Sequence, residues 1–289
     1  MKPYLSVLLV FSLCLSVNAQ RKRSPYAGGR PGVKQNAFLE KQWWIGLKAG
    51  TNLSEATPEV RYAVVSPTNY NPSFGEKQYD SYNKTGSQAT LEITFYIKRL
   101  SFSLQPTYRH SRFAYNNRYD WFNTANVAER LELKYDHEQK TDFADIPFLI
   151  KYDITGHKLR PYIQAGVYYS FLISASQSVK VSGTDFASGG VNQFSNPPII
   201  IGSEDLFTNY WGWMAGLGLD YNIGNVRLVL EGTYQMGMSN MTNTQNRFSN
   251  DRLAGIGEAQ DDLNLNNIVI SMGVLFPMRF LSNSFRTLD

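Results

Sequence analysis

The sequence predicts an all-β protein: an eight-stranded antiparallel up-and-down transmembrane β-barrel with four long extracellular loops and short periplasmic turns. Apolar and polar residues alternate with period two over segments of about ten residues, which is typical of strands with two different faces. Short and long connections alternate between these segments, as in the meander of bacterial outer-membrane barrels. The mean hydropathy of −0.32, with one long apolar run at the N-terminus, excludes a bundle of transmembrane helices.

The N-terminal segment, residues 1–19, is predicted to be a signal peptide, so we expect the protein to be exported. Lys2 precedes an apolar stretch that ends on Val17-Asn18-Ala19, the small-x-small pattern that signal peptidases accept. The sole cysteine, Cys14, lies inside this segment, which excludes disulfides and cysteine nucleophiles from the mature chain. Residues 20–42 are basic and contain several glycines and prolines, which predicts a flexible periplasmic segment.

The expected strands follow one another within a barrel domain at 43–280, and a short tail covers 281–289. Each strand alternates bulky apolar residues with small or polar ones. In chain order, with one apolar pair for each, the strands are 43–53 (Ile45, Leu47), 88–97 (Leu91, Ile93), 100–109 (Phe102, Leu104), 144–152 (Ile146, Phe148), 161–171 (Ile163, Val167), 211–221 (Trp213, Leu217), 226–235 (Leu228, Leu230) and 267–276 (Ile270, Met272). The even number of strands leaves both termini in the periplasm.

The long connections are expected at 54–85, 112–142, 174–209 and 240–262, and the short ones at 98–99, 153–159 and 222–225. A soluble barrel of the lipocalin type also has eight strands, so the composition of the two faces has to separate the alternatives. One face carries Trp, Phe, Ile and Leu, whereas the other carries glycines and hydrogen-bonding residues. The small and hydrogen-bonding residues fit a narrow lumen, and the bulky apolar residues fit contact with lipid. This composition favours a barrel in the cell outer membrane, in contact with its lipid.

Four strand segments resemble those of PorT-like outer-membrane β-barrel proteins. They are Gly-Leu-Lys-Ala-Gly-Thr-Asn-Leu-Ser at 46–54, Phe-Ser-Leu-Gln-Pro-Thr-Tyr at 102–108, Ile-Pro-Phe-Leu-Ile-Lys-Tyr at 146–152 and Arg-Pro-Tyr-Ile-Gln-Ala-Gly at 160–166. The resemblance spans Trp43 to about Phe280. It implies the barrel fold and, because the namesake subgroup serves type IX secretion and gliding, an accessory role in that machinery. The basic segment before Trp43 and the tail after Phe276 depart from the pattern.

Charged residues on the polar strand faces predict a lumenal charge network. An eight-stranded lumen is too narrow to hydrate each charge separately, and buried charges are tolerated when they are paired. We therefore expect Glu92 and Glu231 to bridge some of the cations and to close the barrel to ions. The members are Lys48, Glu92, Arg109, Lys151, Asp220, Arg227 and Glu231.

The chain is not expected to be an enzyme or to bind a cofactor or metal. Of its three histidines, His137 and His157 are expected in a loop and a turn, and His110 ends a strand beside Ser111, which points to the opposite face. Loop carboxylates lack calcium-motif spacing, and glycine-rich pieces lack the setting of a phosphate loop. A loop-borne hydrolase acting on surface lipid or peptide stays open as the alternative.

The expected function is therefore that of a small structural or interaction protein. A net charge of +4 does not fit a nucleic-acid partner. Aromatic residues in the long loops suit contact with a membrane or extracellular protein, and they equally suit loops that pack on one another. The aromatic residues expected at a partner are Tyr70, Tyr79, Tyr115, Trp121 and Phe122.

Overall fold

The computed structural model describes residues 41–62, 76–155, 158–223, 225–255 and 257–278. Its contacts separate a first unit, Met1–Leu39, from a second, Glu40–Asp289, and the fold below is that of the second unit. The predicted signal peptide, nearly all of the basic segment and the predicted tail lie outside the described residues.

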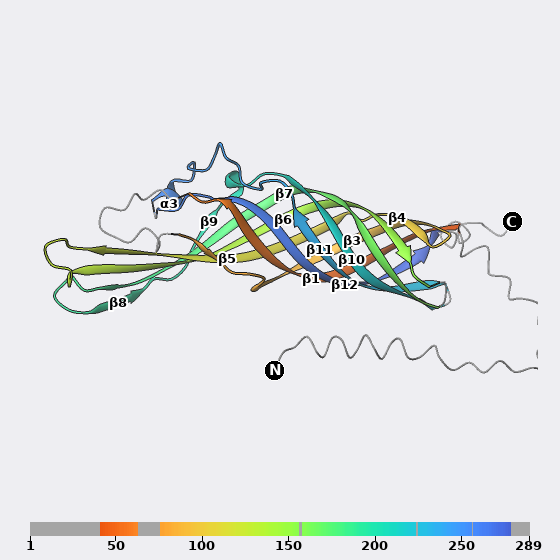
Figure 1. The fold of residues 1–289 in the computed structure, drawn as a ribbon, viewed down its shortest axis with the longest axis horizontal. Coiled ribbons are helices and arrows are strands. Elements are labelled where there is room, and N and C mark those ends of the chain that lie inside the picture. Colours follow the sequence, from red (N-terminus) through yellow and green to blue (C-terminus); the bar gives the residue numbers. More distant parts are fainter. Residues whose placement is uncertain (1–40, 63–75, 156–157, 224, 256, 279–289) are drawn as a thin grey trace, which may run out of the picture. The chain divides into compact units, whose positions relative to one another are not determined.

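Eight long antiparallel strands close into a ring, which confirms the predicted barrel (Figure 1). Each strand pairs with the next along the chain, and the last strand returns to the first, so that Leu47 lies opposite both Leu91 and Val274. One ring strand is divided at Gln105–Pro106, since Pro106 has no N–H to donate. The strands are β1 (Lys41–Val60), β3 (Lys84–Ile97), β4 (Leu100–Leu104) with β5 (Thr107–Phe122), β6 (Arg130–Asp153), β7 (Leu159–Asp185), β10 (Tyr210–Ile223), β11 (Val226–Gly237) and β12 (Asp262–Pro277).

Short connections gather at one end of the ring, the turn end, and long ones at the other, the loop end (Figure 1). At the turn end, Lys98 and Arg99 join β3 to β4 with positive φ at both residues, 45° and 74°. This is the geometry of a two-residue hairpin turn whose twist matches that of the strands. The loop end carries β2 (Gln78–Tyr79), β8 (Asn192–Ser195), β9 (Ile199–Gly202), a 3-10 turn η3 (Glu204–Leu206) and α3 (Asp251–Ala254).

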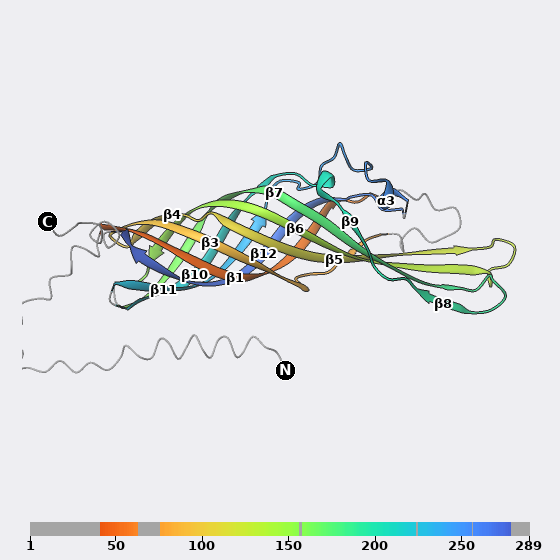
Figure 2. The ribbon, with the colours of Figure 1, turned by 180° about the vertical axis from the view of Figure 1, so that it is seen from behind.

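Two of the predicted long loops are largely strand. β5 and β6 stay paired from Thr107 opposite Asp145 to Phe122 opposite Arg130, and β7 follows β6 as far as Asp185. The three strands therefore project beyond the ring at the loop end, where β8 and β9 add to β7 (Figure 2). The predictions of loops over 112–142 and 174–209 were wrong in this respect, because hydrogen-bonded strands of the barrel continue into water without a break.

The outward faces of the ring form an apolar belt. Leu47 is 69% exposed and Ile270 is 61% exposed, and apolar residues on the neighbouring strands are also exposed. Along β1 the belt runs from Trp43 to Leu53, which at about 3.3 Å per residue and a tilt of about 40° spans about 25 Å, the height of the apolar band in outer-membrane barrels. Exposed aromatic residues border it, with Trp43, Tyr152 and Tyr221 towards the turn end and Tyr108 and Trp211 towards the loop end. No helix among the described residues is long and apolar enough to cross a membrane.

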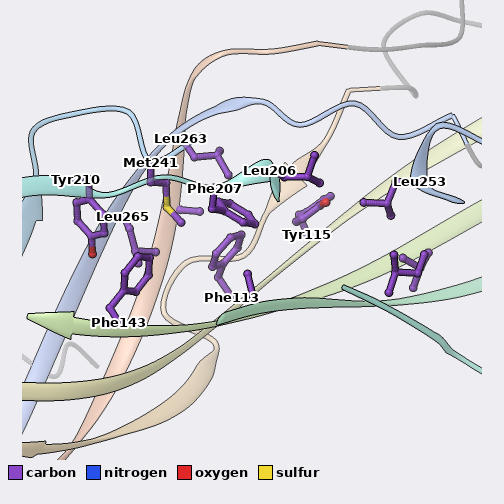
Figure 3. Packing of buried hydrophobic residues seen from close by; sticks show 14 of the residues in the cluster. Phe113, Tyr115, Phe143, Leu206, Phe207, Tyr210, Met241, Leu253, Leu263 and Leu265 are labelled. Carbon is purple, nitrogen blue, oxygen red and sulfur yellow. The ribbon is translucent and has the colours of Figure 1, made fainter. Parts of the chain in front are cut away.

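The inward faces are polar along most of the ring and apolar at the loop end. Small residues make room in the narrow part: a Cβ atom added at Gly218 would overlap the ring of Tyr162. Towards the loop end, Phe113, Phe143 and Tyr210 meet residues from η3 and from the connection after β11 (Figure 3). This loop-end plug consists of Phe113, Phe143, Leu206, Phe207, Tyr210, Met241, Leu253, Leu263 and Leu265.

Candidate functional site

Four of the predicted lumenal charges meet at the centre of the barrel. Lys48 Nζ lies 2.5 Å from Glu231 Oε1 and 2.8 Å from Glu92 Oε2. Lys151 Nζ lies 2.6 Å from Glu92 Oε1 and 3.8 Å from Glu231 Oε2. We call these residues the lumen quartet. Its two ammonium groups and two carboxylates have no net charge, and each carboxylate contacts both lysines, which is the arrangement that low-polarity surroundings tolerate.

Hydroxyl and amide groups add further hydrogen bonds to the quartet. Thr94 donates to Glu92 Oε1 at 2.7 Å, and Lys48 also donates to Gln105 Oε1 at 2.9 Å. Glu231 accepts from the Ser271 hydroxyl at 3.0 Å and from the Tyr162 hydroxyl at 3.0 Å. The quartet and these partners come from seven of the eight ring strands, so the quartet ties the barrel together across its lumen.

The remaining predicted charges pair elsewhere in the lumen. Towards the loop end, Arg109 makes a two-pronged contact with Asp145, at 2.6 Å and 3.1 Å, and donates to the Tyr210 hydroxyl at 2.6 Å. Towards the turn end, Arg227 lies 3.1 Å from Asp220, and its guanidinium stacks 4.2 Å from the centre of the Trp44 ring.

Three lumenal residues were missed by the sequence analysis. Asp145 is the partner of Arg109. It lies on the polar face of the predicted strand 144–152, so the alternation of residues was sufficient to predict that it faces the lumen. Arg160 lies 3.5 Å from Asp153, and both residues stand just outside the predicted strands. Longer strands would have included them in the lumenal set.

A second group of polar residues, the loop-end cluster, joins two long connections to the β5–β6 hairpin. Lys77 Nζ lies 2.8 Å from Glu258 Oε1 and 3.1 Å from Asp261 Oδ1. Tyr79 donates to Asp261 Oδ2 at 2.8 Å, and Tyr115 donates to Glu258 Oε1 at 3.1 Å. The sixth member is His137. The cluster lies beside the loop-end plug, because Tyr115 belongs to the same group of packed buried side chains as Leu253 of the plug (Figure 3).

His137 lies on β6, buried in this cluster, rather than in a loop as predicted. Its ring stacks on that of Tyr115 with the centroids 4.5 Å apart. Gln177 Nε2 lies 2.9 Å from Nδ1, and Asn117 Oδ1 lies 3.3 Å from Nε2, so the neutral form with the proton on Nε2 fits both neighbours. Burial lowers the pKa of His137 despite the carboxylate of Glu258, whose Oε2 lies 3.7 Å away.

The aromatic residues expected at a partner do not share one surface. Tyr115 is only 2% exposed and points inward, and Tyr79 is half-buried against it. Trp121 packs on the apolar residues of the loop end, and Phe122 is half-buried near the tip of the hairpin. Tyr70 lies outside the described residues, as does His157. For Tyr115 the expectation of an exposed contact residue was wrong, because the inward strand face becomes apolar beyond the belt.

The outward face of β5 and β6 holds one further polar group at the border of the belt. Asp142 Oδ1 lies 2.7 Å from His110 Nδ1 and accepts a hydrogen bond from the Tyr108 hydroxyl at 2.9 Å. Asp142 Oδ2 accepts from the Ser174 hydroxyl at 2.7 Å. Among the described residues, no group of three or more His, Cys, Asp or Glu side chains is placed to hold a metal ion.

The comparison with protein families agrees with this architecture. A family model described as outer membrane protein beta-barrel domain matches residues 18–243. No curated protein matches the sequence. Among solved structures, Neisserial surface protein A is 14% identical, with 81% of this chain and 96% of that chain covered and a TM-score of 0.33. Outer membrane protein W of E. coli is 11% identical, with 82% and 97% covered and a TM-score of 0.33.

The attachment invasion locus protein of Yersinia pestis is 11% identical, with 81% of this chain and 99% of that chain covered and a TM-score of 0.29. All of these TM-scores are low, so the assignment of the fold depends on the strand pairings and on the family match. Together they place this chain in the outer membrane as a β-barrel, with lipid around its apolar belt.

Proposed function

Because the chain belongs to the outer membrane protein beta-barrel domain family, we propose that it is a non-enzymatic barrel, closed to ions, which acts as a structural and interaction protein through its loop end. The observation that carries this proposal is the blocked lumen. The quartet of buried charges fills the centre, the Arg109–Asp145 pair lies beyond it, and the loop-end plug covers both. An ion would have to displace all three layers, since an eight-stranded ring leaves no space beside them.

The loop end is the part of the molecule that we propose for recognition. We infer that it faces the cell exterior and that both termini are periplasmic, because outer-membrane barrels place short turns in the periplasm and long connections outside. The strands β5, β6 and β7 project there as a hydrogen-bonded sheet rather than as irregular loops. Because the backbone of a paired sheet is already ordered, little conformational entropy is lost when a partner binds it.

Planar-bilayer recordings test the closed state. We expect no steady conductance from the wild-type protein and none from a variant with a cut hairpin tip, since the blocking layers lie inside the ring. Steady porin-like conductance of the wild type would show that the lumen is open and would remove the main support of the proposal.

The finer proposal is an accessory role in type IX secretion or gliding, and its support is the PorT-like resemblance of the strand segments. Affinity purification from native membranes, with a tag placed after residue 289, tests it. Recovery of secretion-machinery subunits in stoichiometric amounts is the expected result. A different stoichiometric partner would refute this role and would keep the interaction function.

One observation favours the alternative of a surface-lipid hydrolase. His110 Nδ1 is held by Asp142, and His110 Nε2 has no hydrogen-bond partner among the described side chains, as a general base requires. However, Ser174 donates to Asp142 rather than to the imidazole, so water would have to act as the nucleophile. Release of fatty acid from outer-membrane lipid by the wild type, and its loss in His110→Ala, would establish the hydrolase; no release from either protein is what we expect.

A further inference from the structure

The outward face of β5, β6 and β7 changes from apolar to charged immediately beyond the belt. On β5 the exposed Tyr108 is followed on the same face by His110 and Arg112, and on β6 the belt gives way to Asp142, Lys140 and Glu138. An extra residue in β7, Ile173, shifts the register there, so that Ser174 and Ser178 face outward beside Asp142 and Glu138. The headgroups of the surrounding lipid necessarily lie against these rows, because they begin where the acyl chains end.

In the rows next to the belt, this face has more cations than carboxylates that are free to pair with them. Glu138 serves two cations at once, Arg112 at 2.6 Å and Lys84 at 3.4 Å. Lys140 has no ionic partner within the described part of the chain. The carboxylate of Asp142 is occupied by hydrogen bonds from Tyr108 and Ser174 and by His110, so it does not reach these cations.

On the opposite side of the barrel, β1 and β12 do not present such a row of cations. At the same level, β1 presents Glu55 and Glu59, and β12 presents Asn264 and Asn266, with Asn264 donating to Glu59 at 2.6 Å. An anionic headgroup would therefore be attracted to β5–β7 and repelled from β1.

Farther along the same strands lies a hollow of about 370 Å³ on this outward face. Its lining includes Asp80, Asn116, Asp136, Glu138, Ser178 and Lys180. Carboxylate, amide, hydroxyl and ammonium groups in one hollow can both accept from and donate to the hydroxyl groups of a sugar. From the membrane outward, the face thus presents an apolar belt, a row of cations and a polar hollow.

We propose that this face binds the phosphorylated saccharide headgroup of an outer-leaflet glycolipid. The acyl chains lie on the belt, a phosphate group contacts Arg112 and Lys140, and the sugars beyond the phosphate occupy the hollow. The order of chemical groups along the lipid matches the order of surfaces along the strands. This inference rests on the proposed orientation, with the loop end at the cell exterior.

The test measures binding of phosphorylated glycolipid to the purified barrel in detergent. The probes are a lipid A glycolipid with attached core sugars, the same glycolipid after removal of its phosphates, phosphatidylglycerol and inorganic phosphate. The double variant Arg112→Gln/Lys140→Gln removes the two cations assigned to the phosphate and leaves Lys84 and Lys180 in place. The control, Arg61→Gln/Arg252→Gln, removes the same charge from exposed positions elsewhere at the loop end.

We expect the intact glycolipid to bind the wild type most tightly and the double variant about twenty-five-fold more weakly, at about fivefold for each cation. The control should bind like the wild type, and all proteins should show the heat-dependent gel migration of a closed barrel. Equal binding of the dephosphorylated glycolipid, of phosphatidylglycerol or by the double variant would overturn the proposal. Binding in detergent does not depend on the orientation of the barrel in the membrane. If the glycolipid binds but the loop end is inaccessible from outside on whole cells, the proposed orientation is refuted and this site is not.

Discussion

Removal of Glu231 is the sharpest perturbation of the barrel interior. Its carboxylate is 5% exposed and accepts from Lys48 at 2.5 Å, from Ser271 at 3.0 Å and from Tyr162 at 3.0 Å. In Glu231→Ala the quartet keeps two ammonium groups and a single carboxylate, and two hydroxyl donors lose their acceptor. Loss of one partner from a buried charge network typically costs about 3 to 5 kcal/mol, so we expect the free energy of unfolding to fall by about that amount.

Two matched variants separate the charge from the volume of the side chain. Glu231→Gln keeps the shape and an acceptor oxygen but lacks the charge, and we expect a smaller loss. Leu228→Ala removes an apolar side chain of the same strand that faces the belt and is 40% exposed. Lipid or detergent fills the gap in that variant, so we expect a loss of less than about 1 kcal/mol.

Urea titrations of the barrel in detergent micelles, followed by tryptophan fluorescence and by gel migration, give the three free energies of unfolding. A Glu231→Ala protein as stable as the wild type would show that water or counter-ions screen the lumen and that charge pairing does not hold it closed. A larger effect of Leu228→Ala than of Glu231→Ala would contradict the assignment of the two strand faces.

Three further predictions concern other parts of the chain. The intact mass of the membrane-extracted protein should correspond to a chain that begins at Gln20, and a mass that includes residues 1–19 would contradict the predicted signal cleavage. The protein should remain in the outer-membrane fraction and migrate faster on SDS gels before boiling than after, whereas recovery in the soluble periplasm would refute the membrane barrel. Burial lowers the pKa of His137 below its ordinary value of 6.5, so the cluster's stability is present above that value and is lost as the pH falls through the lowered pKa. The amide protection factors around His137, which correct exchange rates for their intrinsic pH dependence, should therefore fall in acid in the wild type and stay level in His137→Gln; the same acid response in both would refute the role of this histidine.

The alternation of residues determined much of the fold. Period two located all eight ring strands and assigned Lys48, Glu92 and Glu231 to the inward face, because successive side chains in a strand point to opposite sides. The same pattern could not choose the partners of these charges. Lys48 and Glu231 are 183 residues apart and lie on strands that are not neighbours, so only the stagger of the closed ring brings them together. The same stagger pairs Arg109 with Asp145 rather than with Glu92 or Glu231.

The tertiary structure also decided where strands end. Inside the membrane the bulky apolar residues point outward to lipid, and beyond it the same strands turn apolar residues such as Phe113 and Tyr115 inward and charged residues such as Arg112 and Glu138 outward. The sequence prediction recognised a strand by apolar residues on its outward face. It therefore assigned the projecting part of β5, β6 and β7 to loops. The physical reason is the change of surroundings along a single strand, from hydrocarbon to water, which reverses the face that must be buried while the backbone ladder continues unchanged.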